Sequence, residues 1–129
     1  MAGYFPSTKK DSGIINYDDS NIQKTGQKWI DGRDVYQATC VFQQAFTANT
    51  TTVLVHNIPD IDAVLNINAA HVEHGNGNKT VLNHYETTVA NNIYTAVSDT
   101  NVSLFVGNNY TGVWQVNKLY VTFDFVKTP

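Results

Sequence analysis

The chain has 129 residues, and only 15% of them are charged, well below the roughly 25% that is usual for soluble domains. Asparagine and threonine supply 15 residues each, so most of the polarity comes from uncharged amides and hydroxyls. The net charge of −3 argues against nucleic-acid binding, which needs clustered basic residues, and no apolar run approaches the ~18 residues of a membrane span.

The first 28 residues differ in composition from the rest of the chain. They contain glycines, a proline and two polar runs but no sustained hydrophobic period, which is typical of an extended segment. We therefore predict an N-terminal arm over residues 1–28 and one folded head domain over residues 29–129. Because 42% of the whole chain is hydrophobic, a domain of this size can build a core without disulfides. The single cysteine, Cys40, lies on an apolar alternation and is predicted to be buried.

Apolar and polar residues alternate with a period of two through most of the chain after residue 35, as expected for strands with one buried face. No window shows a convincing period of 3.6 residues, so no helix is predicted. Clusters of Asn, Gly, Asp and Ser separate the alternating segments, and the strand spacing of roughly 8–12 residues predicts an all-β fold, an antiparallel β-sandwich of jelly-roll type. The expected strands cover residues 35–46, 52–56, 61–69, 80–89, 92–97, 102–106 and 113–126.

The last predicted strand, 113–126, has large apolar side chains on both faces. The face that should be exposed carries Trp114, Val116, Tyr120 and Val126. An exposed patch of this kind on a soluble protein favours an interface with another chain, and the alternative is a strand buried on both faces.

Catalytic and metal-binding patterns are weak in this sequence. Asp60 and Asp62 share one strand face, but local carboxylate pairs also arise in turns and caps. His71, Glu73 and His74 have the chemistry of zinc ligands, yet a closed zinc site needs four convergent ligands, and solvent-facing histidines at a strand end are the commoner arrangement. No nucleophile elbow, P-loop or dinucleotide fingerprint occurs. We predict no catalytic residues, no metal ligands and no cofactor.

Saccharide binding fits the composition better than catalysis does. Sugar recognition combines aromatic faces, which pack on apolar C–H patches, with planar amides that hydrogen-bond to hydroxyls, and it needs little net charge. The segments 107–114 and 74–78 each place asparagines beside aromatic or imidazole side chains. The predicted ligand-binding residues are Asn108, Asn109, Tyr110 and Trp114, with His74 and Asn76 as a second rim.

The segment 24–37, KTGQKWIDGRDVYQ, resembles a segment that recurs in tail-tip and tail-fibre proteins of bacteriophages and prophages, where it reads roughly TGxxWIDGKPIYxK. Those proteins also tend to close on an alternating segment similar to residues 118–128, in the same order along the chain. Arg33 and Asp34 replace the common Lys-Pro pair. The region between the two segments holds no motif that resembles a known binding site of that family.

Within the motif, Asp31-Gly32 is a turn dipeptide, because Asp bonds through its carboxylate and Gly accepts positive φ. We predict a hairpin whose arms hold Trp29 and Ile30 on one side and Val35 and Tyr36 on the other. Trp29 is expected to be a packing anchor, between arm and head or between protomers, rather than a sugar platform.

The resemblance implies the C-terminal head or tip domain of a phage tail receptor-binding or fibre protein. Such domains are β-sandwiches that assemble as homotrimers, contact other tail or baseplate proteins and bind host cell-surface saccharides, so the expected location is the virion tail tip, acting at the bacterial surface. Two alternatives remain: a purely structural trimerising tip module, and a polysaccharide-degrading tail enzyme that uses Asp60 or Glu73. An arm with no recognisable virion-attachment domain predicts a fragment of a longer fibre.

Overall fold

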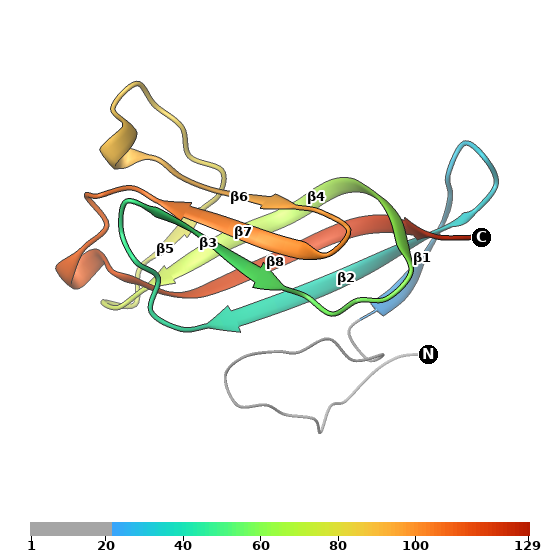
Figure 1. Ribbon diagram of the computed structural model, residues 1–129, viewed down its shortest axis with the longest axis horizontal. Coiled ribbons are helices and arrows are strands. Elements are labelled where there is room, and N and C mark those ends of the chain that lie inside the picture. The colour runs from blue at the N-terminus through green and yellow to red at the C-terminus, as the bar shows by residue number, and fades with distance from the viewer. Residues whose placement is uncertain (1–21) are drawn as a thin grey trace.

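The fold is an antiparallel β-sandwich, as seen in a computed structural model that describes residues 22–129 (Figure 1). The larger sheet has the strand order β1-β2-β8-β4-β5 and the smaller sheet has the order β3-β7-β6. The predicted all-β sandwich is therefore confirmed for the described part of the chain. The elements are β1 (Ile22–Lys28), β2 (Asp34–Gln43), β3 (Thr50–Val55), β4 (Ile61–His74), β5 (Lys79–Val81), the 3₁₀ turn η2 (Val89–Asn91), β6 (Ile93–Val97), β7 (Asn101–Val106), the 3₁₀ turn η3 (Gly112–Trp114) and β8 (Val116–Lys127).

The core lies between the two sheets and follows the alternation of the sequence. β2 and β8 pair without a register shift and point every second side chain inward, as predicted. Burying one such Leu, Val or Phe contributes roughly 1.5–3 kcal/mol. Cys40 is buried as predicted, and desolvation raises the pKa of its thiol to about 12, so it behaves as a small hydrophobe. The facing core residues are Ala38, Cys40 and Phe42 of β2, Val102, Leu104 and Val106 of β7, and Leu119, Val121, Phe123 and Phe125 of β8.

The chain crosses between the two sheets four times. The connections between strands lie at two opposite ends of the sandwich (Figure 1). The hairpin end holds the β1–β2 turn, the β3–β4 connection, the β6–β7 turn and the last residues of β8. The loop end holds the β2–β3 and β4–β5 connections, the loop 82–92 that contains η2, and the segment 107–115 that contains η3. Within residues 22–129, no helix is long and apolar enough to cross a membrane.

The sandwich begins earlier than predicted. Residues 22–28 form the edge strand β1, paired with β2, and therefore belong to the head rather than to an arm. An edge strand needs few apolar residues: Ile22 packs against the core, and the Thr25 hydroxyl donates to the Val35 carbonyl at 3.0 Å. The rest of the predicted arm, residues 1–21, lies outside the described residues.

The β1–β2 turn has the predicted Asp-Gly geometry but shorter arms. Gly32 has a φ of 90°, and the Asp31 carboxylate accepts the Arg33 N–H at 3.1 Å. Trp29 and Ile30 lie in the turn itself rather than in a strand, and they are 38% and 91% exposed. The predicted anchoring role of Trp29 stays a prediction.

Two other strands differ from prediction. The expected strand 80–89 is reduced to β5 (Lys79–Val81), and the last strand begins at Val116 rather than at residue 113, because η3 forms first. Val116 and Val126 are fully buried, and Tyr120 stacks on the neighbouring His71 ring at 4.4 Å between ring centroids. The apolar stripe predicted as an interface on the last strand is therefore absent, since its members are buried, stacked or, in the case of Trp114, outside the strand.

Candidate functional site

The loop end brings the two predicted ligand rims into one cluster. His74 is the last residue of β4, and its ring stacks on Tyr110 with ring centroids 5.6 Å apart and planes 8° from parallel. The Trp114 ring meets the same imidazole edge to face at 5.3 Å. The segments 74–78 and 107–114, well separated in sequence, therefore build a single site.

His74 fixes the centre of this cluster and does not face solvent. Its side chain is 1% exposed, with Nδ1 2.6 Å from the Trp114 carbonyl oxygen and Nε2 2.8 Å from the Thr80 hydroxyl. A carbonyl only accepts, so Nδ1 carries the proton of that bond, and the Thr80 hydroxyl holds the other ring nitrogen. The prediction of a solvent-facing His74 is wrong, and the geometry gives this residue a positioning role instead of the predicted ligand contact.

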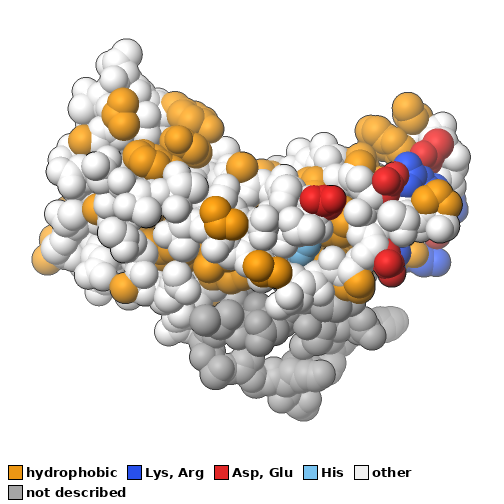
Figure 2. Space-filling view, viewed as in Figure 1, with side chains coloured by type: hydrophobic (Ala, Val, Ile, Leu, Met, Phe, Trp, Pro, Cys, Tyr) orange, Lys and Arg blue, Asp and Glu red, His pale blue; other side chains and the backbone are white. Residues whose placement is uncertain are grey.

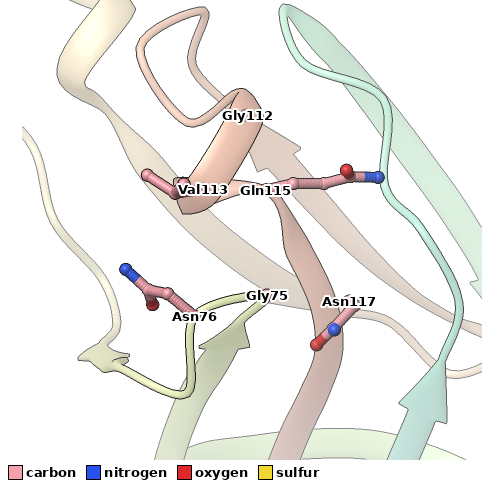
Figure 3. A pocket seen from close by; sticks show the side chains of 6 residues that line it. All are labelled: Gly75, Asn76, Gly112, Val113, Gln115 and Asn117. Carbon is pink, nitrogen blue, oxygen red and sulfur yellow. The ribbon is translucent and has the colours of Figure 1, made fainter.

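A pocket of about 460 Å³ opens beside this cluster (Figure 3). It lies between the β4–β5 turn, η3 and the start of β8, with Asn76 and Val113 on one side and Gln115 and Asn117 on the other. None of the residues that line it is charged. The lining residues are Gly75, Asn76, Gly112, Val113, Gln115 and Asn117.

Main-chain bonds hold the pocket walls together. The Gly75 N–H donates to the Gln115 carbonyl at 2.7 Å, which joins the β4–β5 turn to the residues that precede β8. The Asn76 side-chain oxygen accepts the Asn78 N–H at 3.0 Å, so its amide nitrogen is the group left to donate to a ligand. Gly112 has a φ of 61°, a conformation that suits glycine and lets η3 turn the chain into β8.

Apolar surface accompanies the amides. Val113 is 67% exposed and lines the pocket, and Trp114, the next residue, is 42% exposed although it contacts His74. The arrangement therefore offers amide donors and acceptors together with apolar and aromatic surface, and no ionic group.

The loop 82–92 packs against the start of the segment 107–115. Gly107 donates its N–H to the Asn92 carbonyl at 2.8 Å, and the loop approaches so closely that a Cβ on Gly107 would lie 2.4 Å from the Ala90 carbonyl oxygen. Glu86 stabilises the loop internally, because its carboxylate accepts from the Asn91 amide at 2.9 Å and pairs with the His84 ring at 2.7 Å. These contacts hold the pKa of Glu86 below its ordinary value.

Two predicted contact residues, Tyr110 and Asn109, do not line the pocket and are anchored to this loop. The Tyr110 hydroxyl donates to the Asn91 carbonyl at 3.0 Å, and burial raises the pKa of that hydroxyl, which keeps it protonated. Asn109 donates its N–H to the Ala90 carbonyl at 3.0 Å and hydrogen-bonds through its side chain to the Asn91 amide. Asn108 is exposed at the turn. Of the six predicted residues, Asn76 lines the pocket, Trp114 borders it, and Tyr110, Asn109 and His74 support it.

Three lining side chains were not predicted: Val113, Gln115 and Asn117. The sequence places them in the expected last strand, where alternation suggests core or plain surface. One signal in the sequence was available: the amides Gln115 and Asn117 flank Val116, and residues two apart on a strand share a face.

None of the carboxylates considered for catalysis lines the pocket, and two of them, Asp62 and Glu73, are paired with cations. Asp62 contacts Arg33 at 2.8 Å at the hairpin end. Glu73 lies between Lys79 at 3.3 Å and Lys118 at 3.7 Å. Among residues 22–129, no three His, Cys, Asp or Glu side chains gather in a way that could hold a metal ion.

Comparison of the chain with protein-family models, with curated proteins and with solved structures found no match. The site geometry and the sequence motif of residues 24–37 are therefore the observations on which a function can be argued.

Proposed function

We propose that this chain is the receptor-binding head of a bacteriophage tail fibre or tail-tip protein, and that its loop end binds a neutral host cell-surface saccharide without catalysis. The observation that carries the proposal is the uncharged, amide-lined pocket bordered by the half-exposed Trp114. Ligand sites are typically concave, with apolar walls and a few convergent polar groups, and this pocket has that character.

The pocket chemistry suits sugars. Asn76, Gln115 and Asn117 carry amides that both donate and accept hydrogen bonds, as neighbouring hydroxyls require. Val113 and Trp114 provide apolar surface for the C–H face of a sugar ring. Because the His74–Trp114 and Gly75–Gln115 hydrogen bonds hold the walls in place, little conformational entropy is lost on binding, which favours a small ligand.

The wider setting follows from the resemblance of residues 24–37 to phage tail proteins. It includes a homotrimer, contacts with other tail or baseplate proteins, and a location at the virion tail tip. A single shallow sugar site binds weakly, and linked sites raise avidity by roughly 10²–10⁴ when all can engage at once. A pocket at one end of the sandwich is well placed for such display.

The test is a bacterial glycan array followed by isothermal titration calorimetry with the saccharide that binds. We expect Gln115→Ala and Trp114→Ala each to weaken binding by at least about tenfold, because one removes a pocket amide and the other the bordering aromatic ring. The matched control is Trp29→Ala, which removes a similarly exposed tryptophan from the hairpin end and should leave the affinity unchanged.

Two outcomes would contradict the proposal. A protein that binds neither array glycans nor host cells is a structural tip module. Release of oligosaccharides from host-wall polysaccharide by the wild type, but not by Asp60→Asn or Glu73→Gln, would identify a degrading enzyme.

A further inference from the structure

Each sheet of the sandwich ends in two edge strands, and three of these four edges are protected against pairing with another chain. β1 carries Lys24 and Lys28, with a register shift between them. β5 is only three residues long and contains Lys79. The first half of the β6 edge is covered, because Ile93 and His84 exchange backbone hydrogen bonds at 2.9 and 3.0 Å and the Thr95 N–H donates to the Asn83 side-chain oxygen at 2.6 Å. Charges, shortness, bulges and covering segments are the usual protections of sheet edges.

Within residues 22–129, the fourth edge, β3, lacks all of these protections. Its sequence, TTTVLV, contains no charge, glycine or proline, and it pairs with β7 in unbroken register. Among the described residues, β7 is its only strand partner. Val53 and Val55 are each 59% exposed.

The free backbone groups of β3 can be assigned from its hydrogen bonds. The His56 N–H donates to the Thr100 carbonyl at 3.3 Å, one step beyond the last pair of the ladder. In an antiparallel ladder this makes Val55 part of a non-hydrogen-bonded pair, so its N–H and C=O point away from β7. Alternation extends the same orientation to Val53 and Thr51.

The side chains of these three residues point out of the sandwich, since Leu54, between two of them, packs against the core. The outward face continues onto β7 and β6, where Phe105 stacks on Tyr94 at 5.1 Å, and Tyr85 stacks on Tyr94 at 4.9 Å. None of the three strands carries a charge. In Figure 2 hydrophobic side chains are scattered over this view, and most charged ones gather at the hairpin end.

We propose that β3 pairs antiparallel with β3 of a second copy of this chain, about a twofold axis through Val53. In this register Val53 lies opposite Val53, and Thr51 lies opposite Val55, so all outward side chains stay on one face. A shift by one residue would set outward side chains against inward ones. The three free donors and three free acceptors of each copy then form up to six intermolecular hydrogen bonds.

A second copy of this chain is the partner that the outer edge of β3 fits. The register matches β-branched side chains across the interface, which are favourable cross-strand pairs. Each chain carries a net charge of −3, yet no like charges meet at an uncharged strand. The inference is independent of the proposed function and of threefold assembly.

Disulfide trapping tests the register directly. Val53→Cys should form a disulfide-linked dimer under mild oxidation, because hydrogen-bonded antiparallel partners have Cα atoms about 5.5 Å apart, within disulfide range. Val55→Cys is the matched control, because Val55 is as exposed as Val53. In the proposed register the Val55 residues of the two copies are offset by four residues along the strand, or about 14 Å. Buried Cys40 does not compete. Equal crosslinking of the two variants would overturn the register.

Sedimentation equilibrium tests the contact itself. We expect the wild type to form even-numbered oligomers, and Val53→Lys to weaken this association at least about tenfold by opposing two ammonium groups. Val81→Lys, at a 77% exposed valine on the edge strand β5, should leave association unchanged, and circular dichroism checks that both variants fold. A wild type that is only monomeric overturns the inference. One that is only trimeric also overturns it while supporting the proposed function.

Discussion

His56 shows how a single buried side chain couples the fold to pH. It is 1% exposed and lies where β3 leaves the smaller sheet. Its Nε2 donates to the Ser98 carbonyl at 3.0 Å, and its Nδ1 accepts the Ile58 N–H at 3.1 Å. An N–H donor requires an unprotonated Nδ1, so the ring is neutral in the folded protein. Burial accordingly lowers the pKa of His56.

We predict that the protein loses stability on acidification through this residue. The folded pKa lies below the unfolded value of about 6.5, so the unfolded chain takes up the proton first as pH falls. The stabilisation is complete above that value and is lost as pH falls towards the folded pKa. Its scale is the cost of an unpaired buried N–H, about 1–3 kcal/mol. Urea unfolding at pH 7.5 and pH 5.5 measures it.

His56→Asn is the informative variant for this measurement. Its side-chain oxygen can still accept the N–H two residues ahead but does not titrate, so the pH dependence should be smaller than in the wild type. Overall stability should fall at both pH values, because the smaller side chain leaves a cavity beside Phe123. Equal pH slopes in the two proteins would show that His56 is not the titrating group.

At the same scale, sequence patterning predicted the burial of Cys40 and the positive φ of Gly32, since both follow from neighbours in the chain. It did not predict that His74 is buried. That depends on Tyr110 and Trp114, which arrive from another loop, and no local pattern encodes their approach. Gln115 was missed for a related reason, because the turn η3 shifts the start of β8.

At the scale of elements, the loop 82–92 holds residues 107–110, the segment that leads into the pocket residues Gly112 and Val113. Gly107 is the point of closest approach, where a Cβ would lie 2.4 Å from the Ala90 oxygen and 2.7 Å from the Asn92 oxygen. Both are backbone atoms, so the loop itself would have to move. We predict that Gly107→Ala destabilises the protein by about 1–3 kcal/mol, a typical cost of overpacking, and weakens saccharide binding.

Gly75→Ala is the control for this prediction. A Cβ there would lie 3.6 Å from the Gln115 oxygen, an ordinary contact, so the unfolding free energy should change by less than about 1 kcal/mol. Urea denaturation of both variants gives the comparison. Similar losses at the two positions would mean that the close approach of loop 82–92 is not what makes Gly107 necessary.

The elements that the sequence predicted well are those fixed by their own alternation. β2 and β7 occur where the periodicity places them. The expected strand 80–89 failed because its residues leave the larger sheet after β5: His84 exchanges backbone hydrogen bonds with Ile93 of the smaller sheet, and the chain then turns through η2. β1 was missed because an edge strand with one half-buried isoleucine has almost no periodic signal.

On the scale of the whole molecule, a cluster of ion pairs lies at the hairpin end, opposite the pocket, and the ion pairs nearer the loop end lie outside the pocket lining. At the hairpin end, Arg33 pairs with Asp31 and Asp62 and donates to the Lys127 carbonyl at 2.8 Å, which ties the turn to β4 and to the end of β8. These pairs lower the pKa of Asp31 and raise that of Arg33. The pocket at the loop end is lined by uncharged residues alone.

The uncharged pocket lining predicts that saccharide binding is insensitive to salt. The screening length falls from about 14 Å at 50 mM to about 4 Å at 500 mM salt, which abolishes long-range attraction but leaves amide hydrogen bonds and ring contacts in place. We therefore expect the dissociation constant to change by less than about twofold over this range, measured by isothermal titration calorimetry. A tenfold loss would show that the ligand is anionic and is attracted by charges outside the pocket, and the assignment of a neutral sugar would then be wrong.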